Sequence, residues 1–138
     1  RGVIAMAHFS RKNYQAAYKE YQRALELFRH IKDERNEVFV LHGQALVLSR
    51  MGEFKRAGQI YRYVAKKYRQ MGIVMREVQV MYARVRTWAS EHKYRAAHRG
   101  YALVETRLQQ LPDNEAKQRM LQSIKQDLDS MRSQLNVM

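Results

Sequence analysis

Residues 13–27 read NYQAAYKEYQRALEL, and the spacing of this stretch returns twice further along the chain. An aromatic residue, a small residue and a second aromatic residue mark its beginning, at Tyr14, Ala17 and Tyr21. A shared register across bulky and small positions indicates an internal repeat. The period is forty residues, and the later copies of the three positions are Phe54, Ala57 and Tyr61, then Tyr94, Ala97 and Tyr101.

Each repeat unit is predicted to form two helices. In the second unit, apolar residues such as Val38, Leu41 and Leu48 recur every three or four positions, which is the period of one helical face. Gly52 then interrupts the pattern and suits the left-handed turn that ends a helix. A second apolar stripe follows, and Gly72 is placed to end it.

The pattern changes after Pro112, the one proline of the chain. Residues 113–136 are predicted to form an amphipathic helix with a polar outer side, as expected of a capping helix that closes a stack of repeats. A coiled-coil dimer helix is the competing interpretation. The apolar face consists of Leu121, Ile124, Leu128, Met131 and Leu135.

Length and composition favour one helical domain spanning residues 1–138. The chain is 46% hydrophobic and 28% charged, and its six Gly and single Pro are too few for a fold with many turns. The absence of Cys excludes disulfides and thiolate metal sites. The expected repeat units are about 1–33, 34–72 and 73–111. Because the chain begins at Arg1, we expect a fragment of a longer protein.

The chain is strongly basic. Twenty-six Lys and Arg against thirteen Asp and Glu leave a net charge of +13. Such a surplus favours acidic partners, including nucleic acid. The positive residues are spread along the chain rather than clustered in a run, so solvated helix faces are the simpler interpretation.

Residues 13–27 and the MGEFKRA stretch at 51–57 resemble the tetratricopeptide repeat family, in which a turn with Gly and an acidic residue precedes an aromatic-x-x-Ala helix. The resemblance covers about residues 1–110. It implies an all-α solenoid of about three helix-turn-helix repeats plus the C-terminal capping helix. It also implies an interaction module for a protein or peptide, as the regulatory or scaffolding part of a larger protein. The forty-residue spacing departs from the family's usual ~34.

Carrying over the family's groove positions places the binding residues on the first helix of each unit. Their mixed apolar, aromatic and basic character suits an acidic or amphipathic peptide. The alternative for Phe39 and Leu46 is packing against a neighbouring helix or repeat. The implied groove residues are Met6, Phe9, Phe39, His42, Leu46, Arg50, Gln79, Tyr82 and Arg86.

No catalytic or cofactor signature occurs in the sequence. There is no His-Glu-x-x-His pattern, phosphate-binding glycine loop or nucleophile elbow, so we expect no enzyme, no metal and no cofactor. Two rival hypotheses remain: a helical-repeat domain that binds nucleic acid, motivated by the charge, and self-association through an apolar end. With no long apolar run or signal peptide evident, we expect a cytoplasmic protein.

Overall fold

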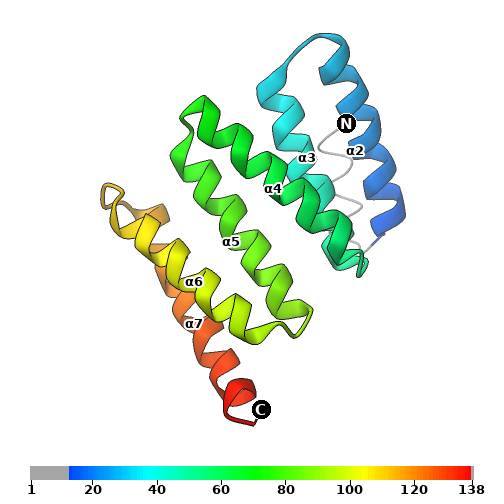
Figure 1. The fold of residues 1–138 in the computed structure, drawn as a ribbon. Coiled ribbons are helices and arrows are strands. Elements are labelled where there is room, and N and C mark those ends of the chain that lie inside the picture. The colour runs from blue at the N-terminus through cyan, green and yellow to red at the C-terminus, as the bar shows by residue number, and fades with distance from the viewer. Residues whose placement is uncertain (1–12, 138) are drawn as a thin grey trace. The chain divides into compact units, whose positions relative to one another are not determined.

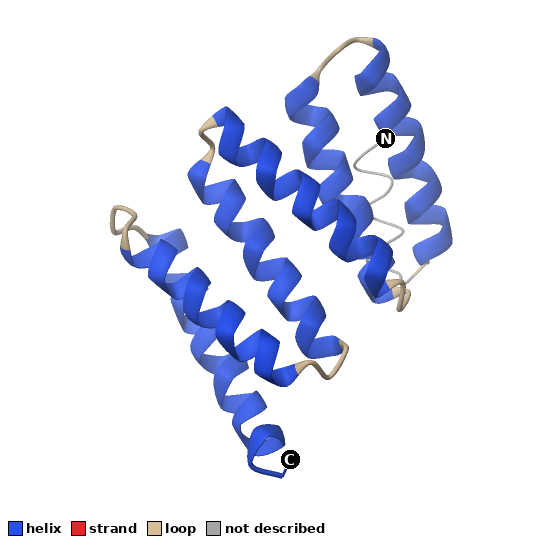
Figure 2. Cartoon of the chain, in the orientation of Figure 1, coloured by secondary structure: helices blue, strands red, loops and turns tan. Residues whose placement is uncertain are grey.

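A computed structural model describes residues 13–137, with side chains as far as Gln134. This part of the chain is helical and contains no strand, which confirms the predicted all-α class (Figures 1 and 2). The helices are α2 (Tyr14–His30), α3 (Glu34–Arg50), α4 (Phe54–Met71), α5 (Val74–Ser90), α6 (Tyr94–Gln109) and α7 (Glu115–Val137).

The chain divides into two compact units, Arg1–Val80 and Met81–Met138, and the division falls within α5. In the first unit α3 packs against both α2 and α4, and in the second α6 packs against α7. Consecutive helices therefore form packed pairs, as helical hairpin repeats require. The predicted repeat boundaries at about 33, 72 and 111 stay a prediction.

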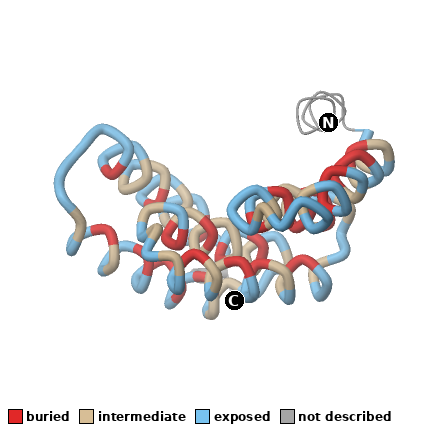
Figure 3. Tube along the Cα trace, turned by 90° about the horizontal axis from the view of Figure 1, so that it is seen from above, coloured by how far each residue is buried: buried red, intermediate tan, exposed pale blue. Residues whose placement is uncertain are grey.

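Small residues allow the helices to approach each other closely. Ala17, Ala57 and Ala97, which occupy the same position of the sequence repeat, are each completely buried. Gly43 of α3 makes a close approach that the sequence analysis missed, because a Cβ there would lie only 2.6 Å from the Tyr21 ring of α2. Buried positions recur along every described helix between exposed ones, as Figure 3 shows.

The turns between helices repeat every twenty residues, which is half the sequence repeat. A residue with positive φ occurs at Lys32, Gly52, Gly72 and His92. After each, the next backbone N–H donates to the carbonyl five residues back, from Asp33 to Phe28 over 2.8 Å and likewise at the other three turns. This pattern caps the last carbonyls of the preceding helix. The predicted turns at Gly52 and Gly72 are confirmed.

Pro112 stands where the twenty-residue pattern would place the next left-handed residue. Its ring fixes φ near −65°, so it cannot adopt that conformation. A longer connection follows instead, and the Asn114 side chain accepts a 2.8 Å hydrogen bond from the backbone N–H of Lys117 as α7 begins. Helix α7 therefore starts at Glu115, close to the predicted start at residue 113.

An ion pair recurs in the first unit at the forty-residue spacing. Arg29 near the end of α2 lies 3.1 Å from Glu37 in the first turn of α3. Arg69 near the end of α4 lies 2.9 Å from Glu77 in the first turn of α5. Since Glu77 is only 1% exposed, its carboxylate needs this partner. Carboxylates near a helix start also interact favourably with the helix dipole.

The left-handed turn at Lys32 yields a stability prediction. A residue with a Cβ is disfavoured at φ 59°, whereas glycine adopts this conformation freely. We expect Lys32→Gly to raise the free energy of unfolding by about 0.5–1 kcal/mol in urea titrations. Lys32→Ala is the control, because it removes the same exposed side chain and keeps the disfavoured conformation. Equal stability of the two variants would contradict the explanation.

Candidate functional site

The described residues offer no site for metal chemistry. No group of three or more His, Asp or Glu within residues 13–134 is arranged to hold a metal ion. Among the same residues, no helix is both long and apolar enough to cross a membrane.

Four of the implied groove residues lie on one stripe of α3, at positions three and four apart. Phe39 is 45% exposed, His42 and Leu46 are half-buried, and Arg50 is exposed at the end of the helix. We call these residues the α3 stripe. Met6 and Phe9, the groove residues of the first unit, lie outside the described residues.

The beginning of α5 adds a cation to the α3 stripe. The guanidinium carbon of Arg76 lies 5.3 Å from the centre of the Phe39 ring, which is within cation–π range. Gln79 follows three residues later on α5 and is half-buried. Sequence reasoning missed Arg76, although its spacing of three from Gln79 indicates the same helix face.

His42 is held neutral beneath this cation. Burial, with a smaller contribution from the positive charge of Arg76, lowers the pKa of His42 to about 4. The imidazole also meets the buried Tyr61 ring edge-on, with 5.9 Å between the ring centres. At neutral pH, Arg76 therefore supplies the positive charge beside Phe39, and the imidazole contributes none.

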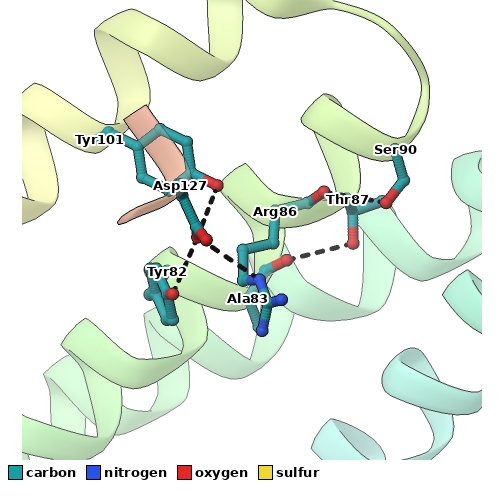
Figure 4. A network of polar contacts seen from close by, with 7 residues as sticks. All are labelled: Tyr82, Ala83, Arg86, Thr87, Ser90, Tyr101 and Asp127. Atoms are coloured by element: carbon teal, nitrogen blue, oxygen red, sulfur yellow. Dashed lines mark hydrogen bonds and ion pairs between the residues drawn. The ribbon is translucent and has the colours of Figure 1, made fainter. Parts of the chain in front are cut away.

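The remaining two implied groove residues, Tyr82 and Arg86, contact a carboxylate of the chain itself. Tyr82 and Tyr101 each donate a 2.9 Å hydrogen bond to the same oxygen of Asp127 on α7. The Arg86 Nε lies 3.5 Å from that oxygen. Figure 4 shows the three side chains converging on Asp127 within the second unit.

The environment of Asp127 keeps both phenols protonated. Burial, then the hydrogen bond and charge of Asp127, raises the pKa of Tyr82 to about 12. The pKa of Tyr101 is raised even further, again first by burial and then by Asp127. Two neutral O–H donors and one cation thus stabilise a carboxylate, which is the pattern of a satisfied polar network.

Sequence reasoning did not single out Asp127. The signal was present, because Asp127 lies three residues after the buried Ile124 and four before the buried Met131. That spacing places a carboxylate on the packed face of the predicted capping helix. Beside the network, a hollow of about 240 Å³ is lined in part by Arg86, Ser90 and Ser130.

Arg84 and Trp88 form a cation–π pair on α5. The guanidinium carbon of Arg84 lies 4.9 Å from the indole ring centre, one helical turn away on α5. Trp88 is half-buried and lies close to Gly100 of α6, where a Cβ would lie 3.1 Å from the indole. The tryptophan thus packs between neighbouring helices, at the repeat position that Leu48 occupies forty residues earlier.

The comparisons with known proteins identify a family. A family model described as tetratricopeptide repeat matches residues 2–73, just over half of the chain. Neither the curated proteins nor the solved structures gave a match.

The Asp127 network yields a second prediction. Asp127→Ala removes the acceptor of two phenols, one of which belongs to the buried Tyr101. We expect a loss of about 1–3 kcal/mol in the free energy of unfolding and a lower pKa of Tyr82 in an ultraviolet titration of the phenols. Asp129→Ala, at an exposed position of the same helix, is the control and should change neither quantity. Identical behaviour of the two variants would rule out a role for the network.

The environment of His42 yields a third prediction. Because its folded pKa is lowered from 6.5 to about 4, the unfolded chain binds the proton first as the pH falls. Stability is therefore complete above pH ~6.5 and is lost between there and pH ~4, by about 2–3 kcal/mol. Urea titrations at several pH values should show that His42→Gln lacks this loss relative to the wild type. His98→Gln, at an exposed position, should retain it; a His42→Gln profile parallel to the wild type would be the contrary result.

Proposed function

The chain belongs to the tetratricopeptide repeat family, and from this premise we propose that it binds a segment of another protein across the α3 stripe and the adjoining beginning of α5. Proteins of this family generally mediate protein–protein interactions and are typically non-catalytic. The proposal assigns the same role to this chain and locates it on residues of the first compact unit.

The main support for the proposal is the aromatic side chain of Phe39, which stays exposed beside the guanidinium of Arg76. Phe39 leaves 45% of its surface in contact with solvent, and Arg76 stacks on it without covering it. An exposed aromatic ring gains free energy when a partner buries it, at about 25 cal/mol per Å² of apolar surface. A neighbouring arginine adds charge-assisted hydrogen bonds to a carboxylate.

The chemistry of the stripe defines the kind of segment that suits it. Phe39 and Leu46 offer an apolar track along α3, while Arg50 and Arg76 are exposed cations at its sides. His42 contributes no charge at neutral pH, so an apolar side chain can lie over it without leaving a buried cation. An amphipathic segment with acidic residues fits this arrangement best.

The second unit is the weaker candidate for the same ligand. Tyr82 and Arg86 already contact the carboxylate of Asp127, so a ligand carboxylate would compete with an internal one. A charge reversal at Arg86 would also put two like charges together and disturb the network. Peptide binding is therefore tested with substitutions in the α3 stripe and at Arg76.

We expect the purified chain to bind peptides that combine apolar and acidic residues, on an array in which the two kinds of residue are varied independently. For the best peptide, Phe39→Ala combined with Arg76→Glu should weaken binding about tenfold or more in fluorescence anisotropy, because both an anchor and a cation are lost.

The matched control places the same two changes elsewhere. Leu103→Ala combined with Arg99→Glu alters an apolar residue that is 63% exposed and an exposed arginine, both on α6. This variant should bind as the wild type does. Equal weakening by the two double variants, or binding that does not depend on acidic residues of the peptide, would refute the proposal.

A further inference from the structure

Helix α4 carries six positive side chains and no acidic one. Three of them, Lys55, Arg62 and Lys66, are exposed and make no ion pair with any described residue. They lie seven and four positions apart, so they share the outward side of the helix. We call these three residues the α4 cations. Their unneutralised charge is a local feature that the overall net charge does not reveal.

The other cations of α4 are held by partners at its flanks. Arg56 contacts Glu53 over 3.1 Å, Lys67 contacts Glu34 over 3.3 Å, and Arg69 pairs with Glu77. The helix thus separates its positive charge into paired residues at the sides and unpaired residues facing solvent.

Aromatic rings lie beside two of the paired cations of α4, Lys67 and Arg56. Tyr63 is 45% exposed, and the Lys67 ammonium lies 5.6 Å from its ring centre. The guanidinium of Arg56 lies 5.6 Å from the ring centre of Tyr18 on α2 and donates a 2.9 Å hydrogen bond to its hydroxyl. These tyrosines differ from the repeated Tyr21 and Tyr61, which are buried packing residues.

A hollow of about 260 Å³ adjoins Tyr63 and is lined by residues of α2, α3 and α4. The lining residues are Arg29 of α2, Leu41 of α3, and Gln59, Ile60 and Tyr63 of α4. An exposed ring at the edge of a hollow that also contains an arginine and an amide is suited to hold a flat, polar group. A nucleobase is such a group, since bases stack on aromatic and guanidinium planes and accept hydrogen bonds at their edges.

We propose that the α4 cations and Tyr63 form a binding surface for single-stranded nucleic acid, with phosphates on the cations and a base on the tyrosine. The α4 cations span eleven residues, or about 16 Å of helix. A single strand covers that distance with about three to five nucleotides, since stacked bases are ~3.4 Å apart and an extended strand is longer. This combination of aromatic stacking with a positive track is typical of proteins that bind single strands without sequence preference.

Two other polyanions fit the surface less well. A membrane-binding helix needs a broad apolar face, whereas the exposed side of α4 contains Tyr63 as its only exposed large apolar residue. An acidic protein segment would use the cations, but it would leave the ring and the hollow beside it without a role. The surface is also separate from the α3 stripe, which shares no residue with it.

The test measures fluorescence anisotropy of a labelled twelve-nucleotide oligouridylate at several salt concentrations. A triple charge reversal, Lys55→Glu with Arg62→Glu and Lys66→Glu, should weaken binding at least tenfold and reduce the salt slope by about two, at ~0.7 per lost phosphate contact. The control triple, Arg95→Glu with Arg99→Glu and Lys125→Glu, makes the same change in net charge at exposed positions of α6 and α7. It should weaken binding threefold or less.

The stacking role is tested separately from the charge. Tyr63→Ala should weaken binding of the oligonucleotide about five- to twentyfold with an unchanged salt slope, because only a ring is lost. Phe39→Ala is the matched control, since Phe39 is equally exposed, at 45%, but lies on the α3 stripe. It should leave the affinity for the oligonucleotide unchanged.

Three results would overturn the proposal. The first is equal weakening by the two triple variants, which would show that net charge alone attracts the strand. The second is an unchanged affinity in Tyr63→Ala together with equal displacement by polyglutamate, which would indicate an acidic protein segment. The third is binding to vesicles of anionic lipid that the α4 triple abolishes, with no binding of the oligonucleotide.

Discussion

Close approach between neighbouring helices is the constraint on which this structure depends. A methyl group or a hydrogen atom stands where a larger side chain would separate the helices: Ala17, Ala57 and Ala97 are fully buried, and the space beside Gly43 is filled by the ring of Tyr21. Buried tyrosines occupy the wider gaps between the small residues, so small and bulky positions are complementary. The sequence repeats every forty residues because each pair of helices needs the same arrangement of small and bulky side chains.

The connections follow a second, shorter period. Left-handed residues every twenty positions end the helices in the same way, although glycine fills only two of the four places. The hydrogen bonds that cap the helix are made by backbone atoms, so a lysine or a histidine can stand at this position at a modest energetic cost. Proline cannot, and at Pro112 a longer connection to α7 replaces the left-handed turn.

The role of each positive side chain depends on whether an acidic residue lies beside it. Arg29 and Arg69 are committed to glutamates at the beginning of the next helix, and Arg86 lies against Asp127. Arg76 stacks on the exposed ring of Phe39, and the outward cations of α4 contact no acidic residue that the structure describes. These positive residues are therefore divided between structural pairs and the two proposed surfaces, one with apolar and one with stacking character.

The sequence by itself determined the all-α class, the helix pairs, the turns at Gly52 and Gly72, and the buried alanines, because apolar periodicity and glycine conformation act over a few neighbouring residues. It also placed the α3 stripe on one helix face. Only the tertiary structure decided that Tyr82 and Arg86 contact Asp127, that Arg76 stacks on Phe39, and that Lys32 and His92 adopt left-handed turns. The contacts join residues on different helices, and the two turns are fixed by backbone hydrogen bonds that side-chain type does not reveal.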